Sequence, residues 1–211
     1  MGTSAKELTN FINKYHKLAI IDILHVFTDI TESTNINTRD VTLLDINSSY
    51  VTLKWKQNMY KVESAYLKEA SSKQEVFFQI AEDAAKNRNV APVRITKVLW
   101  PIDPLGLLVI FGVLLPPIVY VYRPFLYWIP IIPSVITPYL DNDIVLIIIM
   151  ILEFLIHICE TFFILLPKLK YYRVPYKHYK CWYFLGFLEG FGPCLRIEKE
   201  AALKLSKYKK Y

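Results

Sequence analysis

The distribution of apolar and polar residues divides this chain into a polar first half and an apolar second half. Up to about residue 98, apolar positions recur with helical or alternating spacing among charged residues. Beyond that point they form long runs, and residues 144–166 read IVLIIIMILEFLIHICETFFILL. A bilayer span needs roughly 20 apolar residues, so this run is long enough to cross one. The pattern predicts a small α+β cytosolic head, residues 1–88, followed by an α-helical membrane region with proline-broken spans, residues 105–197.

The head is expected to have the element order α-β-β-(β)-α. Apolar residues three or four positions apart predict one helix over residues 8–27. Alternating and β-branched segments predict a hairpin and a short third strand, at residues 41–46, 50–56 and 60–62. Ser72 and Glu75 have the spacing of a capping box at the start of a second amphipathic helix, residues 72–86. These elements are enough for a small core.

The membrane region is expected to begin after a proline-containing linker, residues 89–104. Its first span, residues 105–122, contains Pro116 and Pro117, which are expected to break or kink it. Residues 125–140 carry three prolines and are short for a straight span, so they are predicted to be re-entrant or a broken helix. Residues 182–195 form a last apolar segment that glycines interrupt.

Basic residues predict the orientation. The loop from Lys168 to Lys180 is rich in lysine and arginine, which favours the cytosolic side. The basic tail, residues 198–211, has Lys207 and Lys209 in the K-x-K-x-x spacing of a dilysine retrieval signal of endoplasmic-reticulum membrane proteins. A cytosolic head and tail require an even number of crossings. Two full spans with two partial segments satisfy every charge cue, whereas four full spans would place the basic loop on the opposite side.

Three ionisable residues interrupt the longest apolar run. Glu153, His157 and Glu160 are spaced i, i+4, i+7 and therefore share one face of a helix. A charge near the centre of a bilayer costs at least about 2.5 kcal/mol, so this face is expected to pack against the first span or a partner. Three interpretations remain open: a structural polar seam between helices, a contact to lipid or a partner, or a site for a proton or a metal.

The sequence gives little support to other classes of function. The net charge of +6 is not gathered with aromatic residues on one polar element, so a nucleic-acid partner is not expected. The chain has none of the G-x-S-x-G, P-loop, G-x-G-x-x-G or C-x-x-C motifs. We therefore assign no catalytic residues and expect a protein that is not an enzyme.

The segment FINKYHKLAIIDIL resembles the motif that opens the C-terminal domain of HugZ-like haem-utilisation proteins. Asn13 and His16 coincide with the Asn and His of that motif, and the predicted hairpin follows as in the family. The resemblance covers roughly residues 8–88 and implies a contact to haem or another ligand at Asn13 and His16. The flavin-binding barrel that normally precedes this domain is absent, so flavin is not implied.

A second resemblance covers the membrane region. HICETFFILLPKLK followed by WYFLGFLEGFGPCL is similar to small multispan membrane proteins, with His157, Glu160, Trp182 and Gly190 at the matching positions. Head, spans and tail together resemble fungal endoplasmic-reticulum proteins associated with ergosterol biosynthesis. This resemblance implies a non-catalytic accessory protein of lipid or sterol metabolism, with the bilayer and a membrane enzyme as partners. The alternative is a membrane protein that handles haem or iron.

Overall fold

The computed structural model describes residues 5–31, 34, 36–47, 50–63, 72–130 and 132–208. Contacts between residues divide the chain into two compact units. The first unit comprises residues 1–94, 171–173 and 202–211, and the second comprises residues 95–170 and 174–201. The chain therefore returns to its first unit twice after leaving it, and helix α10 contributes residues to both units.

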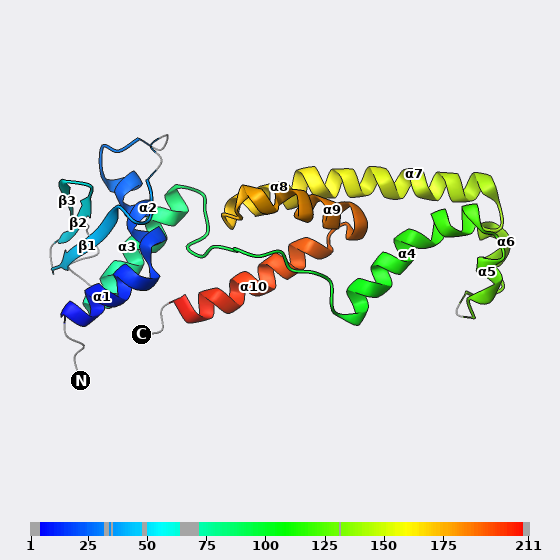
Figure 1. Cartoon of the computed structure of the whole chain (residues 1–211), viewed down its shortest axis with the longest axis horizontal. Coiled ribbons are helices and arrows are strands. Elements are labelled where there is room, and N and C mark those ends of the chain that lie inside the picture. Colours follow the sequence, from blue (N-terminus) through cyan, green and yellow to red (C-terminus); the bar gives the residue numbers. More distant parts are fainter. Residues whose placement is uncertain are drawn as a thin grey trace. The chain divides into compact units, whose positions relative to one another are not determined.

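The first unit combines helices with a small antiparallel sheet (Figure 1). Its elements are α1 (Ala5–Tyr15), α2 (Lys17–Phe27), β1 (Val41–Ile46), β2 (Tyr50–Trp55), β3 (Asn58–Glu63) and α3 (Lys73–Asn87). The strands lie in the order β1-β2-β3, with Leu43 opposite Leu53 and Val51 opposite Val62. Helix α2 packs on α3 and contacts β1. The predicted α+β order is confirmed, although the expected helix over residues 8–27 is two helices.

The division of that helix falls at His16. His16 has φ −121° and ψ 32°, outside the helical range, while its N–H still donates to the Ile12 carbonyl at 2.8 Å. Helix α1 can then contact β1 while α2 packs on α3. Nothing in the local residue types required a break there, because none of them is glycine or proline. Both helices contact β1, and the packing of α2 on α3 in addition explains the change of direction.

Buried apolar side chains stabilise the first unit. The residues that are almost completely buried come from every element and include Ile12, Ile20, Ile23, Leu43, Leu53, Phe77 and Ile80. Burying one such side chain contributes about 1.5–3 kcal/mol. Ser72 caps α3 as predicted, because its Oγ accepts the Glu75 N–H at 3.2 Å.

Late segments of the chain complete this unit. The Ala91 N–H donates to the Tyr171 carbonyl at 2.8 Å, and Arg94 Nε donates to the Arg173 carbonyl at 3.0 Å. Lys204 Nζ donates to the Arg94 carbonyl at 2.8 Å. Tyr208 is 8% exposed. Residues 202–208, expected from the sequence to belong to a separate basic tail, are therefore packed into the first unit.

The second unit is helical (Figure 1). Its elements are α4 (Pro104–Val121), α5 (Phe125–Trp128), α6 (Thr137–Leu140), α7 (Asp143–Cys159), the π-helical segment η2 (Glu160–Leu165), α8 (Leu166–Tyr171), the 3₁₀ turn η3 (Tyr176–His178), α9 (Tyr179–Glu189) and α10 (Gly192–Tyr208). Pro116 and Pro117 lie inside α4 without ending it, so of the two expected effects, a break or a kink, the break does not occur. The proline-rich stretch before α7 forms only the short helices α5 and α6.

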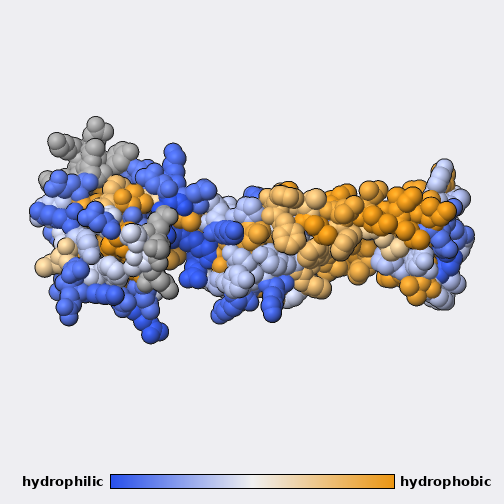
Figure 2. Space-filling view, turned by 90° about the horizontal axis from the view of Figure 1, so that it is seen from above, coloured by the Kyte–Doolittle hydropathy of each residue, from blue (hydrophilic) through white to orange (hydrophobic). Residues whose placement is uncertain are grey.

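Two helical stretches of this unit expose apolar surface. Residues 104–121 have a mean hydropathy of 2.3 and residues 143–171 reach 2.4, and only 11% of each apolar window is buried. Figure 2 shows this hydrophobic surface in orange. By length and composition both stretches are able to cross a membrane. An apolar helix in the core of a water-soluble protein would instead be mostly buried.

A polar cluster joins the C-terminal end of α4 to the N-terminal end of α7. Arg123 forms ion pairs with Asp141, at 3.4 Å, and with Asp143. Its Nη1 also donates to the Leu140 carbonyl at 3.0 Å, and the Tyr127 hydroxyl donates to Asp141 at 2.6 Å. The two apolar helices are thus connected by charged and polar side chains.

Candidate functional site

The turn between α9 and α10, residues 189–192, brings together polar side chains that are far apart in the sequence. On one side it meets α7 and η2, which carry His157 and Glu160. On the other side it borders a cavity next to the start of α4. All of these residues belong to the second unit.

The α7 side contains two members of the predicted ionisable stripe. His157 Nδ1 lies 2.7 Å from the Phe187 carbonyl oxygen, so the ring donates through Nδ1. A Cβ on Gly190 would lie 2.2 Å from Glu160 Oε2 and 3.0 Å from the His157 ring. The carboxylate and the imidazole therefore lie against the backbone of the α9–α10 turn. This is a polar seam with α9, whereas packing against the first span or a partner was expected from the sequence.

Glu153, the third member of the stripe, lies outside these contacts. It is partly exposed, and no hydrogen bond or ion pair joins it to another described residue. Within residues 5–31, 34, 36–47, 50–63, 72–130 and 132–208, no three His, Cys, Asp or Glu side chains gather as a metal site would require. The stripe thus divides into two parts. His157 and Glu160 pack against the α9–α10 turn, whereas Glu153 lies outside that contact.

Glycines allow the close approach on which this seam depends. Gly186 and Gly190 have the G-x-x-x-G spacing that lets helices pack with their backbones close together. A Cβ on Gly186 would lie 2.6 Å from Thr161 Oγ1, and Gly190 has φ +60°. Glycine tolerates such a φ without steric cost. From the sequence, these glycines were expected to interrupt an apolar segment, with Gly190 also at a matching position of the second resemblance, and their role as packing positions was missed.

A buried ion pair forms the other side of the turn. The Glu189 side chain is 1% exposed, and Arg196 donates to both of its oxygens, with Nη1–Oε2 at 2.5 Å and Nη2–Oε1 at 2.9 Å. Arg196 Nε also donates to the Leu99 carbonyl at 2.9 Å. Bidentate pairs of this kind are stronger and more directional than single hydrogen bonds. The sequence offered only one signal for it, a glutamate within an apolar segment.

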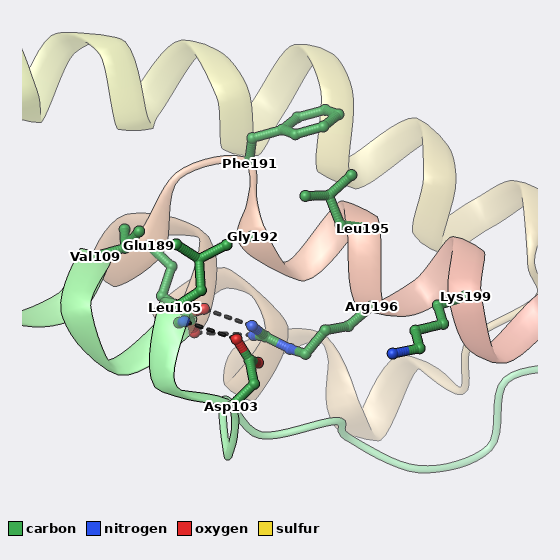
Figure 3. A pocket seen from close by; sticks show the side chains of 10 residues that line it. Asp103, Leu105, Val109, Glu189, Phe191, Gly192, Leu195, Arg196 and Lys199 are labelled. Carbon is green, nitrogen blue, oxygen red and sulfur yellow. Dashed lines mark hydrogen bonds and ion pairs between the residues drawn. The ribbon is translucent and has the colours of Figure 1, made fainter.

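The cavity beside this ion pair has a volume of about 400 Å³. Its lining comes from the first turns of α4 and from the α9–α10 region: Asp103, Leu105, Gly106, Val109, Glu189, Phe191, Gly192, Leu195, Arg196 and Lys199 (Figure 3). Asp103 caps α4, with the Gly106 N–H donating to its Oδ1 at 2.8 Å. That hydrogen bond, with the nearby charges of Arg196 and Lys199, lowers the pKa of Asp103 below its usual value. The cavity therefore combines apolar walls with fixed charges of both signs.

Asn13 and His16, the candidate ligand contacts of the head, serve the packing of the first unit. Asn13 Nδ2 donates to the Leu43 carbonyl and the Leu43 N–H donates to Asn13 Oδ1, both at 2.8 Å. His16 is 6% exposed, and its ring centroid lies 4.9 Å from that of Phe78 and 4.8 Å from that of Tyr208. Burial lowers the pKa of His16 to about 4.

The buried His16 predicts a pH-dependent stability of the first unit. The pKa of an unfolded histidine is near 6.5, so above that pH His16 is neutral in both states and its contribution is complete. As the pH falls from about 6.5 to about 4, the unfolded state binds the proton first. We expect the free energy of unfolding to fall by about 2–3 kcal/mol over this range.

Pulse proteolysis of the full chain across a urea series, at about pH 7 and about pH 5, measures this loss. His16→Phe keeps an aromatic ring and removes the titration, so its stability should change less with pH than that of the wild type. Carboxylates titrate equally in both proteins and cancel in the difference. An identical pH dependence of wild type and His16→Phe would contradict the prediction.

The observed architecture is that of a small α+β unit joined to a helical unit with two exposed apolar helices. Comparison with known proteins places this chain in a family. Residues 103–203 match the family model described as YDR476C-like C-terminal domain. The chain is also 34% identical over 207 residues to the uncharacterized protein YDR476C of Saccharomyces cerevisiae. This alignment covers 90% of this chain and 92% of that protein. The chain belongs to the YDR476C-like family. No solved structure matches it.

The resemblance of the head to HugZ-like proteins is wrong, and so is that of the whole chain to fungal proteins associated with ergosterol biosynthesis. The family shown is YDR476C-like, and no HugZ-like family is shown. The physical reason lies in what the shared residues do. Asn13 pairs with the backbone of β1, and the His16 ring packs against aromatic side chains of neighbouring helices. An Asn and a His at this spacing thus serve ordinary packing of a helix on the sheet and on other helices. The haem contact at Asn13 and His16 was implied only by the HugZ-like resemblance, so it is no longer implied.

The dilysine signal remains a prediction. Lys207 is exposed in the last turn of α10, directly before the buried Tyr208. Lys209 lies outside the described residues.

Proposed function

We propose that this protein crosses a membrane twice and serves there as a non-catalytic accessory protein. The observation that supports this proposal is the exposed apolar surface of residues 104–121 and 143–171. An exposed surface of this size and hydropathy is stabilised by lipid tails and destabilised by water. The polar cluster around Arg123 would then lie on one side of the bilayer, with the α9–α10 turn near the other.

The proposed setting is the endoplasmic-reticulum membrane, with lipid or sterol metabolism as the process served. Its support is the basic loop from Lys168 to Lys180, the lysines of the tail, and the lack of common hydrolase, nucleotide and redox motifs. In this proposal the first unit and the tail are cytosolic. The partner is a membrane enzyme of lipid or sterol synthesis.

A topology experiment tests the two-span proposal. Asn47, which begins the sequon Asn-Ser-Ser, should stay unglycosylated in microsomes, whereas a glycosylation acceptor inserted after Ser134 should be modified. The protein should also remain in the membrane during alkaline carbonate extraction. The control is the same acceptor inserted in the basic loop after Tyr176, which should stay unmodified. Release by carbonate, or glycosylation at Asn47, would contradict the proposal.

The accessory role is tested in the same membranes. A tagged full-length chain, solubilised in mild detergent, should co-purify with a membrane enzyme of lipid or sterol synthesis, and its deletion should lower the level or activity of that enzyme. Turnover of a lipid substrate by the purified protein alone would contradict a non-catalytic role.

A further inference from the structure

The cavity beside the α9–α10 turn combines features that match one class of ligand. It lies at the first turn of α4, where the apolar stretch begins. The cavity is lined by Leu105, Val109 and Leu195, which are 68%, 40% and 55% exposed. Their apolar surface is therefore accessible to the hydrocarbon part of a ligand. Figure 3 shows Asp103, Arg196 and Lys199 beside these apolar side chains. The lining is therefore amphipathic, with charges next to an apolar wall.

The positive charges of the cavity retain hydrogen-bonding capacity. A guanidinium has five N–H groups, and Arg196 uses three of them on Glu189 and the Leu99 carbonyl. Two remain for an anionic oxygen. Lys199 follows one turn later on α10 and forms no ion pair with another residue of the described chain. Both cations are thus suited to a phosphate group at this position.

Negative charges of the cavity argue against a simply anionic ligand. Glu189 is buried against Arg196, and Asp103 uses Oδ1 to cap α4, which leaves Oδ2 free to accept from a cationic group. The two acids and two bases sum to zero formal charge. A ligand with one phosphate and one ammonium complements both signs, whereas a purely anionic ligand meets two carboxylates.

We propose that this cavity binds a zwitterionic glycerophospholipid, with its phosphate toward Lys199 and Arg196, its ammonium toward Asp103, and an acyl chain along Leu105 and Val109. The inference rests on the proposed membrane insertion, which would place the start of α4 at headgroup depth. Trp100, 53% exposed and shortly before α4, is the type of residue enriched at that depth.

Native mass spectrometry of the full chain in mild non-ionic detergent tests the proposal. The protein is incubated with equal amounts of phosphatidylethanolamine, phosphatidate and diacylglycerol carrying the same acyl chains, and the bound lipids are counted. We expect phosphatidylethanolamine to be retained preferentially. Asp103→Asn keeps an N-cap oxygen and removes the charge, and Lys199→Gln keeps most of the side-chain length. Each should reduce retention about tenfold, as expected for the loss of one hydrogen bond to a charged group.

Lys207→Gln is the matched control, because Lys207 lies on the same helix, exposed and outside the cavity. It should retain the lipid like the wild type. Preferential retention of phosphatidate, especially if Asp103→Asn increases it, would overturn the zwitterionic assignment. The assignment would also be overturned if Asp103→Asn and Lys199→Gln retained as much phosphatidylethanolamine as the control Lys207→Gln. Absence of bound lipid in a protein that resists carbonate extraction would refute this inference alone, whereas release by carbonate would refute the proposed membrane insertion.

Discussion

Replacing Asp22 with alanine should lower the free energy of unfolding of the first unit by about 3–5 kcal/mol, because it leaves two arginines without their shared partner. The Asp22 side chain is 1% exposed and pairs with Arg88 Nη1 at 2.6 Å and with Arg173. Arg88 follows α3, and Arg173 belongs to the segment that returns from the second unit. This carboxylate therefore connects α2 to two other parts of the chain.

Pulse proteolysis of the full chain across a urea series measures the loss. Asp29→Ala is the matched control, since Asp29 is exposed just after α2, and its effect should stay within about 0.5 kcal/mol. Replacing the whole cluster, with Asp22→Leu, Arg88→Leu and Arg173→Met together, should recover much of the stability, because no buried charge is then unpaired. A loss below about 1 kcal/mol for Asp22→Ala would show that water compensates the arginines.

Replacing Gly190 with alanine should disrupt the packing of α9 on α7. The added Cβ would lie 2.2 Å from Glu160 Oε2, a separation that requires the carboxylate or the turn to move. Gly190 also has φ +60° and ψ −114°, a conformation that side chains disfavour. Backbone strain and overpacking each cost about 1–3 kcal/mol, so the combined effect should be large.

The thermal unfolding midpoint of the full chain in detergent measures this effect. Gly112→Ala is the matched control, because Gly112 lies inside α4 and a Cβ added there would meet no described atom within 4 Å. We expect that variant to unfold at or above the midpoint of the wild type. Adding Glu160→Ala to Gly190→Ala should recover part of the loss, since it removes the closest steric conflict and leaves the tight contact with His157 and the backbone strain. An unchanged midpoint for Gly190→Ala would contradict the described seam.

The sequence alone was sufficient for most of the secondary structure. Periodicity and capping residues are local signals, so the strands, the cap at Ser72 and the apolar runs were predicted close to their observed positions. The ionisable stripe was also visible, because residues four and seven positions apart share a helix face. The assignment of the head to a family failed, since a short N-x-x-H pattern also serves ordinary packing, of Asn13 on the sheet and of His16 on neighbouring helices, and is therefore a weak signal.

Tertiary structure decided which polar groups meet. Asp22 pairs with arginines 66 and 151 positions away, and Arg196 reaches back to the Leu99 carbonyl, 97 positions earlier. No periodic pattern encodes such pairs, because periodicity reports only which residues share a face of one element. The positive φ of Gly190 likewise follows from the turn that places Glu189 beside Arg196 and Gly190 beside Glu160. The chain's local pattern thus determined its helices, strands and exposed apolar surface, whereas long-range packing created the polar seam and the charged cavity, because both require residues that only the folded backbone brings within hydrogen-bonding distance.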